Sequence, residues 1–402
     1  MQIEETIYSD LQSLVKSGDN EEHYVLIGYL GNEDIYISNK IQIKEPDFDN
    51  EEKMDAQWIA EFAYQLNLRL PGGVGVVGLA LAMAKCSLED ENRANKAIQR
   101  YYKKLPSFEK EFISENFGLI VCEFNGSGSV RGRIINGTTG AKISNDLKQV
   151  KFNTVQVKSA VSFDFPFYSN NENTTFSEKI NPGLEELTKK LVSSKMFLKN
   201  GSLAKEKEAV NKKGESGPHS YQLFFDTTNT TESLSPKSYS CYLKCEINMK
   251  LECIVLSTSS NLTALNSLKQ DLLRSLSARI ELYSLASSLV ASESGTTNQS
   301  YQEYQLPKKI RIGDEAGKDT PLIEYVEGHD NIEDVVKEVE LLIGNYAKGK
   351  TIIDENEERF RDIASLPSEF EEQKPLNIPF VSILFVILAL IMIPLLKYLS
   401  LI

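Results

Sequence analysis

The sequence predicts an α/β (α+β) protein with two domains and one membrane-spanning helix at its carboxyl end. Strand-like apolar runs alternate with amphipathic helical stretches through residues 24–343. The chain has 402 residues, of which 41% are hydrophobic, and this content is enough for two cores rather than one. Residues 378–396 include no ionisable side chain. We expect a first domain at residues 1–170, a second, smaller α/β domain at 178–345, a linker at 346–374 and a membrane segment at 375–402.

The first domain is expected to begin with a β-hairpin, because two β-rich runs flank the turn signal Gly31-Asn32-Glu33-Asp34 within residues 24–43. A helix containing Trp58 follows, since apolar residues recur there at helical spacing until Pro71-Gly72-Gly73 ends it. The next ten residues read VGVVGLALAM and predict a buried strand. The remaining elements are a helix at 92–105 and strands at 117–124 and 129–135.

The second domain is expected to combine amphipathic helices with short strands. Its longest helix carries one apolar stripe, which indicates a core-facing surface. Gly344 is placed to end the last helix. The predicted helices cover 184–198, 263–289 and 332–343, and the predicted strands cover 221–225, 241–253, 308–313 and 320–326.

Three of the five cysteines lie close together in the sequence, so we ask whether they could bind a metal ion together. Cys241, Cys245 and Cys253 fall on the apolar positions of a strict alternation, which is typical of a strand with one buried face. Along a strand, Cys241 and Cys245 stand about 13 Å apart, too far for two thiolates to share a zinc ion. We expect core cysteines and reduced thiols, and no metal site.

The carboxyl-terminal segment predicts a membrane anchor. At a rise of about 1.5 Å per residue, a helix over 378–396 nearly covers the hydrocarbon layer of a bilayer. The first residues lack a basic region followed by an apolar one, so we expect the bulk of the chain in the cytosol, the N-x-[ST] triplets unused, and a tail-anchored topology. The expected anchor residues include Ile378, Phe380, Leu384, Leu388, Ile391 and Leu395.

The charge of the chain disfavours nucleic acids as partners, and two motifs match nucleotide-binding patterns. A formal charge of −13 disfavours nucleic-acid binding. Residues 344–351 match the P-loop pattern G-x-x-x-x-G-K-[ST], but a helical pattern precedes them where a P-loop follows a strand. Residues 73–78 match G-x-G-x-x-G, which needs a strand before it, and the alternation of residues 66–70 leaves that interpretation open.

The histidines give little support for catalysis. We interpret His219 and His329 as exposed loop residues, since each follows a glycine-containing turn. No catalytic grouping of Ser, His and Asp or of Cys and His is legible from the spacing, so we assign no catalytic, cofactor-binding or metal-binding residue.

Three features of the first domain resemble the odorant-response-abnormal-four family: the residues Gly28-Tyr29-Leu30 after a strand, the helix containing Trp58, and the segment RLPGGVGVVGLAL. The resemblance rests on Trp58, Pro71, Gly72, Gly73 and Gly78, on the chain length and on the terminal membrane helix. Similarity in the second domain is looser and includes the strand around Cys245. We interpret the five residues as a structural signature.

The resemblance implies a first domain similar to an MPN domain, the fold of zinc isopeptidases that remove ubiquitin-like modifiers. Active members place a His-x-His zinc pair after a strand ending Val-Val-Gly. Here Val76-Val77-Gly78 leads to Leu81 and Met83 at those two positions, and neither can bind zinc. The resemblance therefore implies an inactive, partner-binding MPN-like domain.

The expected function is that of a non-enzymatic, tail-anchored adaptor at the endoplasmic reticulum membrane. The resemblance implies a role in folding, trafficking and localisation of multi-spanning receptors of the G-protein-coupled, odorant type. It also implies a heterodimer, formed through residues 1–170, with a protease specific for a ubiquitin-fold modifier. The alternatives are a membrane-bound nucleotide hydrolase using Gly344 to Thr351, and a fusion or tethering protein, for which residues 346–374 lack the necessary heptads.

Overall fold

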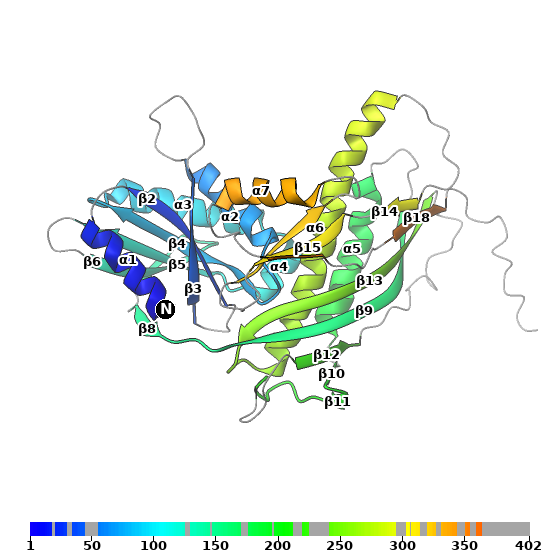
Figure 1. Cartoon of the computed structure of the whole chain (residues 1–402), viewed down its shortest axis with the longest axis horizontal. Coiled ribbons are helices and arrows are strands. Elements are labelled where there is room, and N and C mark those ends of the chain that lie inside the picture. The colour runs from blue at the N-terminus through cyan, green and yellow to red at the C-terminus, as the bar shows by residue number, and fades with distance from the viewer. Residues whose placement is uncertain are drawn as a thin grey trace, which may run out of the picture.

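The structure is a computed structural model, and Figure 1 shows its arrangement. The first sheet has eight strands in the order β7-β6-β5-β4-β2-β3-β1-β8. The predicted hairpin is confirmed, because β2 and β3 pair antiparallel. The structure describes residues 1–363 except 18–20, 30–33, 45–54, 125–128, 145–146, 170–175, 195–196, 212–218, 225–240, 295–302, 306, 314–319, 327–330, 344–349 and 354–358.

Three helices cover the two faces of the first sheet, and a fourth short helix leads towards the second sheet. Ile3, Ile7 and Leu11 at the start of the chain pack on one face, while α2 and α3 pack on the other. The elements are β1 (Gln2–Glu4), α1 (Glu5–Ser17), β2 (Glu22–Tyr29), β3 (Tyr36–Gln42), α2 (Ala56–Leu68), β4 (Val74–Met83), α3 (Leu88–Lys104), α4 (Ser107–Phe112), β5 (Asn116–Glu123), β6 (Ser129–Asn136), β7 (Lys142–Ser144) and β8 (Lys148–Val150).

Local sequence signals explain the burial of β4 and the start of α3. All ten residues of β4 are buried, as the run VGVVGLALAM predicts. Helix α3 begins at Leu88 rather than at residue 92, because Ser87 and Asp90 form a capping box. The Ser87 hydroxyl accepts from the Asp90 backbone N–H at 3.2 Å, and the Asp90 carboxylate accepts from the Ser87 backbone N–H at 3.0 Å.

The second sheet has seven strands in the order β11-β10-β12-β9-β13-β18-β14. Strands β9 and β13 are antiparallel and pair along their whole length, from Cys241 opposite Ser169 to Leu256 opposite Thr154. The elements are β9 (Thr154–Ser169), α5 (Phe176–Ser193), β10 (Phe197–Lys199), β11 (Ser202–Leu203), β12 (His219–Leu223), β13 (Cys241–Leu256), α6 (Asn261–Ser294), β14 (Glu303–Gln305) and β18 (Arg359–Ile363).

The predicted alternation in β13 is confirmed where side chains are described. Met249, Leu251 and Cys253 are buried against α6, whereas Lys250 between them is exposed. The side chains of Cys241 and Cys245 lie outside the described part.

The chain leaves the first sheet earlier than the boundary expected at residue 170. The last strand of that sheet ends at Val150, and β9 already belongs to the second sheet. The physical reason is the alternation of Val155, Val157 and Val161, which share a core with α6. The sequence interpretation had identified no strand there.

A third sheet of three strands, in the order β16-β15-β17, completes the fold. Its residues Ile310, Ile312 and Leu322 share a core with the first sheet, although the sequence interpretation grouped them with the second domain. Residues 346–374 are also more than a linker, because two of their β-rich runs pair in sheets. The elements are β15 (Lys308–Gly313), β16 (Leu322–Val326), α7 (Ile332–Ile343) and β17 (Lys350–Ile353), while β18 joins the second sheet.

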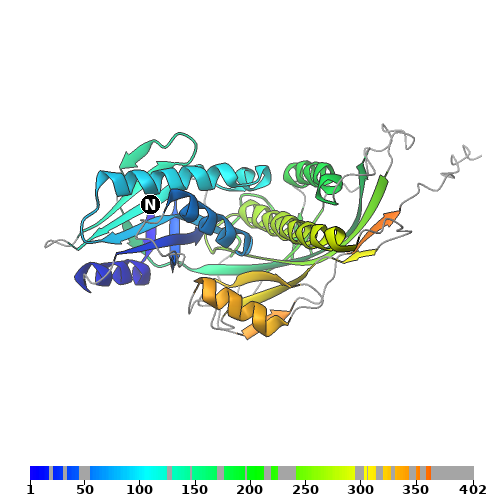
Figure 2. The ribbon, with the colours of Figure 1, turned by 90° about the horizontal axis from the view of Figure 1, so that it is seen from above.

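The paired strands β9 and β13 lie between α6 on one side and the third sheet with α7 on the other (Figure 2). Among the helices of the described residues, none is both long enough and apolar enough for a membrane crossing. The expected anchor at 375–402 lies outside those residues.

Candidate functional site

The predicted signature segment Leu70-Pro71-Gly72-Gly73 connects α2 to β4 at the meeting point of the sheets. Its backbone continues the second sheet, since the Gly72 carbonyl accepts a hydrogen bond from the Ile254 N–H at 3.0 Å. Gly72 also forms an isolated parallel bridge with Cys253. The segment therefore covers an edge of β13 that would otherwise present unpaired backbone groups.

Both glycines are required by close approach to α6 and β13. A Cβ atom on Gly72 would lie 2.0 Å from the Ser267 carbonyl oxygen. Gly73 has a φ of +79°, in the left-handed region that favours glycine, and a Cβ there would lie 2.5 Å from the Ile254 carbonyl oxygen. The structure thus brings Pro71, Gly72 and Gly73 together for a backbone-packing role.

Helix α6 meets this segment with polar side chains. The Gly73 N–H donates to Gln270 Oε1 at 3.0 Å, and the Gly72 N–H donates to Asp271 Oδ1 at 3.4 Å. The Arg274 guanidinium donates to the carbonyl oxygens of Leu70 at 2.7 Å and Val74 at 3.1 Å. Backbone groups on both sides of the Gly-Gly pair are therefore satisfied by one helix.

Glu109 of α4 completes the arrangement. Its carboxylate accepts from Arg274 Nε at 2.7 Å, from Arg274 Nη2 at 3.1 Å and from Gln270 Nε2 at 2.8 Å. The Arg274 and Glu109 side chains are 1% and 0% exposed. Burial lowers the pKa of Arg274, but the adjacent Glu109 carboxylate outweighs it, so the pKa is raised overall. We call Glu109, Gln270, Asp271, Arg274 and Lys309 the junction cluster.

Lys309 links the third sheet to the same helix. Its ammonium group lies 3.0 Å from Asp271 Oδ2, with both side chains almost fully buried. The same Asp271 oxygen accepts from the Glu252 N–H at 3.1 Å. A second tie runs from the Arg69 carbonyl to the Ile323 N–H, at 2.7 Å. The junction cluster thus fixes the three sheets relative to one another.

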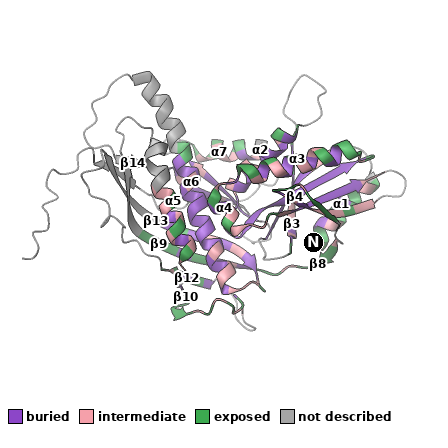
Figure 3. Ribbon diagram, turned by 180° about the vertical axis from the view of Figure 1, so that it is seen from behind, coloured by how far each residue is buried: buried purple, intermediate pink, exposed green. Residues whose placement is uncertain are grey.

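Sequence reasoning missed the junction cluster. It identified the Leu stripe of α6 and made no prediction for the polar residues of that helix. Figure 3 shows buried residues around much of α6, and Gln270 and Arg274 are among them. A local signal was present in the Gly72-Gly73 pair, because adjacent glycines often mark a close approach of the backbone to another element. The sequence did not show which element approaches, since Gln270, which accepts from the Gly73 N–H, lies 197 residues further along the chain.

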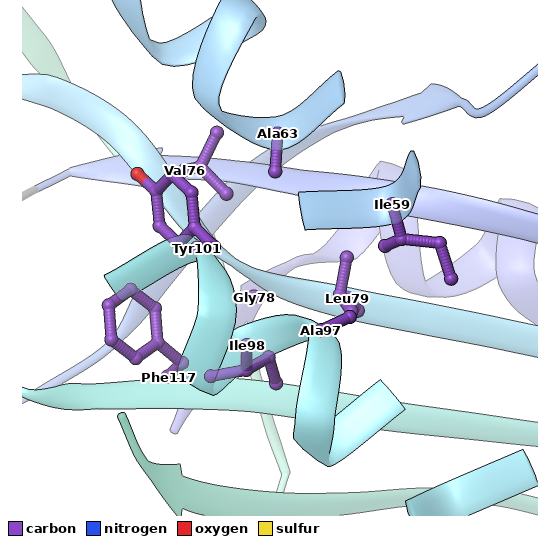
Figure 4. A pocket seen from close by; sticks show the side chains of 9 residues that line it. All are labelled: Ile59, Ala63, Val76, Gly78, Leu79, Ala97, Ile98, Tyr101 and Phe117. Carbon is purple, nitrogen blue, oxygen red and sulfur yellow. The ribbon is translucent and has the colours of Figure 1, made fainter. Parts of the chain in front are cut away.

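Gly78 has a packing role inside β4. A Cβ on Gly78 would lie 1.9 Å from the Gly118 carbonyl oxygen of β5. The cavity beside it has a volume of only about 10 Å³, close to the space needed for one water molecule. Figure 4 shows the apolar side chains of Ile59, Leu79 and Phe117 around it. The dinucleotide interpretation of residues 73–78 is therefore wrong, since the motif is a buried strand without a phosphate-binding turn.

Trp58 lies on α2, apart from the glycines. Its indole N–H donates to the Lys44 carbonyl at 3.3 Å, and the ring packs at the edge of the first core. It anchors the helix that leads into Pro71.

The P-loop interpretation is also wrong in its structural context. Helix α7 precedes residues 344–349, and Lys350 and Thr351 belong to β17, where Thr351 pairs with Ile312. A P-loop requires the opposite order, with a strand before the loop and a helix after it.

The two positions at which an active MPN-like domain would need zinc-binding histidines are buried. Leu81 and Met83 are each 2% exposed within the first core. In the described ranges no group of three His, Cys, Asp or Glu side chains could hold a metal ion. His219, which was expected to be an exposed loop residue, is only 4% exposed because it begins β12, so that expectation is wrong. His329 lies outside the described part.

Two thiols, that of Cys86 in the loop between β4 and α3 and that of Cys122 in β5, are held protonated. Burial raises the pKa of Cys86 to about 11, with help from Glu91, Asp90 and Glu123. Burial also raises the pKa of Cys122 to about 12. Neither has the depressed pKa of a nucleophilic cysteine.

The geometry defines a mixed α/β protein organised around a buried LPGG turn. Residues 25–352 match the family described as ODR4-like, Odorant response abnormal 4-like. Because this span covers most of the chain, the protein belongs to that family, and the family prediction made from Trp58 and the glycines is confirmed. No curated protein matches the sequence.

Several solved structures are similar at low identity. UfSP from C. elegans matches with 9% identity and a TM-score of 0.37, over 85% of this chain and 56% of that protein. A Desulfitobacterium hafniense protein matches with 13% identity and a TM-score of 0.23, over 37% of this chain and 93% of its own. A Salinibacter ruber protein matches with 11% identity and a TM-score of 0.21, over 37% of this chain and 92% of its own.

Proposed function

We propose that this protein is a non-enzymatic, tail-anchored adaptor at the endoplasmic reticulum membrane. It aids the folding, trafficking and localisation of multi-spanning receptors of the odorant type. The observation that carries the proposal is membership of the odorant-response family over residues 25–352. Within this proposal the amino-terminal part is an inactive MPN-like domain, a platform for binding rather than for catalysis.

Two features of the chain support the non-enzymatic assignment. Leu81 and Met83 occupy the positions where an active MPN-like domain would hold its zinc-binding histidines, and both are packed in the core. The polar groups that are buried together, in the junction cluster, bond to one another and to backbone atoms. Such groups stabilise a fold and have no free position for a substrate.

The proposed partner is a protease specific for a ubiquitin-fold modifier, joined through residues 1–170 as a heterodimer. The adaptor would then hold the protease activity at the membrane beside its receptor cargo. Full-length chain and the protease should co-purify from cells and co-elute in gel filtration. Lysine cross-linking followed by mass spectrometry should place the contacts on exposed residues of the first domain, such as Lys96 and Lys103. Absence of co-elution, or cross-links confined to residues 178–345, would refute the pairing.

The proposed localisation has its own test. Full-length chain should stay with membranes in alkaline carbonate, and a chain ending at residue 374 should be released. Endoglycosidase should leave its electrophoretic mobility unchanged, because the proposed topology keeps every N-x-[ST] triplet in the cytosol. Release of the full-length chain by carbonate, or a mobility shift, would contradict the topology without bearing on the partner.

A further inference from the structure

Three asparagines of the chain are followed by glycine: Asn125, Asn136 and Asn200. In an Asn-Gly pair the backbone nitrogen of the glycine can attack the asparagine side chain with little hindrance, because glycine has no Cβ. Asn125 lies outside the described residues. The structure places the other two pairs in opposite surroundings, so the effect of the fold can be separated from that of the dipeptide.

Asn200 and Gly201 form the two-residue turn between β10 and β11, and β11 is an edge strand of the second sheet (Figure 1). Their φ angles are +50° and +79°, left-handed values for which Asn-Gly is the preferred sequence in tight hairpins. Both residues are exposed. Nothing lies within 4 Å of a Cβ added to Gly201. Water and hydroxide therefore reach this turn directly from solvent.

The side-chain amide of Asn200 is polarised, whereas the backbone nitrogen that follows it is unbonded. Asn200 Oδ1 accepts a hydrogen bond from the Ser220 N–H at 3.0 Å. Such a donor stabilises the negative charge that this oxygen gains when a nucleophile adds to Cγ. In the part of the chain that the structure describes, the Gly201 N–H donates to no acceptor. The turn thus presents an activated carbon beside an available nucleophile.

Asn136 has the same dipeptide in a closed arrangement. The Gly137 N–H donates to the Glu115 carbonyl at 2.7 Å, so this nitrogen is engaged. Asn136 Oδ1 accepts from the backbone N–H groups of Thr138 and Thr139, at 3.1 and 2.8 Å, which holds the side chain in place. Gly137 is buried. Attack on Asn136 therefore requires local opening and loss of the Glu115 hydrogen bond.

We propose that Asn200 is a site of spontaneous deamidation and that the fold protects Asn136 from the same reaction. Hydroxide removes the Gly201 N–H proton, and the nitrogen adds to Asn200 Cγ. The Cγ–Nδ2 bond then breaks, and ammonia leaves with a proton taken from water. Water adds to either carbonyl carbon of the resulting succinimide, and cleavage of that C–N bond gives aspartate or isoaspartate. The net reaction consumes one water and releases one ammonia.

Either product changes the hairpin of β10 and β11. Aspartate places a negative charge at an exposed turn. Isoaspartate also inserts a methylene group into the main chain, so the two-residue loop no longer matches the pairing of Lys199 with Ser202. The modification therefore weakens pairing at this edge of the second sheet. This inference does not depend on the adaptor function or on a protein partner.

Peptide mapping of the full-length chain, purified in nanodiscs and stored in mildly alkaline buffer, tests the proposal. Trypsin releases the two pairs in separate peptides, residues 134–142 and 200–205. Digestion is brief and mildly acidic, so that little deamidation occurs during it. Mass spectrometry follows replacement of the amide by a carboxyl group, and chromatography separates the aspartyl and isoaspartyl forms. Peptide 200–205 should convert about tenfold faster than peptide 134–142, with isoaspartate among the products.

The same chain in concentrated urea is the matched control. Unfolding removes the Glu115 hydrogen bond and the turn geometry, and the residues after the two pairs are the similar Thr138 and Ser202. Both peptides should then convert at equal rates. A tenfold difference that persists in urea would place the effect in the sequence rather than in the fold, and so refute the protection of Asn136.

Three outcomes in the folded chain would overturn the proposal. The first is no conversion of peptide 200–205 over several weeks. The second is conversion of peptide 134–142 at the same rate or faster, which would show that an exposed turn and an unbonded Gly201 N–H do not decide reactivity. The third is aspartate without isoaspartate, which would indicate direct hydrolysis of the amide instead of attack by the backbone nitrogen.

Discussion

Gly73→Ala tests the packing of the LPGG segment, and Gly201→Ala is its matched control. Both glycines have a φ of +79°, so alanine meets the same left-handed backbone in each, at a cost of about 1–2 kcal/mol. Only Gly73 is crowded. Its added Cβ would lie 2.5 Å from the Ile254 carbonyl oxygen and 2.8 Å from Ser267 Oγ, whereas nothing lies within 4 Å of a Cβ on Gly201.

The shared cost of the left-handed backbone therefore cancels in the difference between the two variants, which measures the consequences of crowding around the added Cβ. Overpacking of this kind costs about 1–3 kcal/mol, so Gly73→Ala should lose that much more unfolding free energy than Gly201→Ala. Displacement of the Gly73 N–H from Gln270 would add to the loss. Urea unfolding of the full-length chain, followed by circular dichroism, gives both values. Equal losses would refute the claim that α6 and β13 require glycine at this position.

Two further predictions concern buried positions, and a third concerns the half-buried thiol of Cys86. Glu109→Gln should lower the unfolding free energy by about 3–5 kcal/mol, because Arg274 is left as an unpaired buried charge. Gly78→Ala should lose about 3 kcal/mol or more, because the Cβ would meet backbone oxygen of β5 at 1.9 Å. In a variant that retains only Cys86, thiol labelling should accelerate about tenfold per pH unit between pH 7 and 10, because the thiolate is the reactive form. Its pKa of about 11 keeps the thiol protonated over this range.

One control variant serves the two stability predictions. Glu111→Gln removes an exposed carboxylate from the same helix and should change the unfolding free energy little. A Gly78→Ala loss no larger than that variant's would contradict the close approach of β4 and β5. For Cys86, a labelling rate that levels off between about pH 9 and pH 10 would show an ordinary thiol pKa of about 8.5 and refute the effect of burial and its acidic neighbours.

The sequence predicted elements whose signals are local. The hairpin, the buried strand at residues 74–83 and the helix containing Trp58 depend on periodicity within a dozen residues and on nearby turn residues. The alternation at Met249, Leu251 and Cys253 likewise identified a strand and a buried face. In all of these cases the side-chain pattern and the backbone geometry are set by neighbours in sequence.

Features that depend on distant pairing were missed. Strand β9 has a clear alternation only through Val161, and its sheet is determined by β13, more than 70 residues later. The third sheet was assigned to the wrong neighbour, because the apolar character of Ile310 and Leu322 does not indicate which core receives them. The same limit applies to Glu109 and Arg274, whose polar side chains are typical of solvated helices until a partner is known.

The junction also sets an order of events during synthesis. The Leu70 carbonyl and the Arg274 guanidinium that binds it are 204 positions apart in the chain. At about 5–20 residues per second, a ribosome needs roughly 10–40 s to make that interval. Until Ile310 emerges as well, the nascent first sheet lacks part of its core and exposes apolar surface that chaperones recognise. A message truncated within this interval would yield an aggregating product rather than a free-standing amino-terminal half.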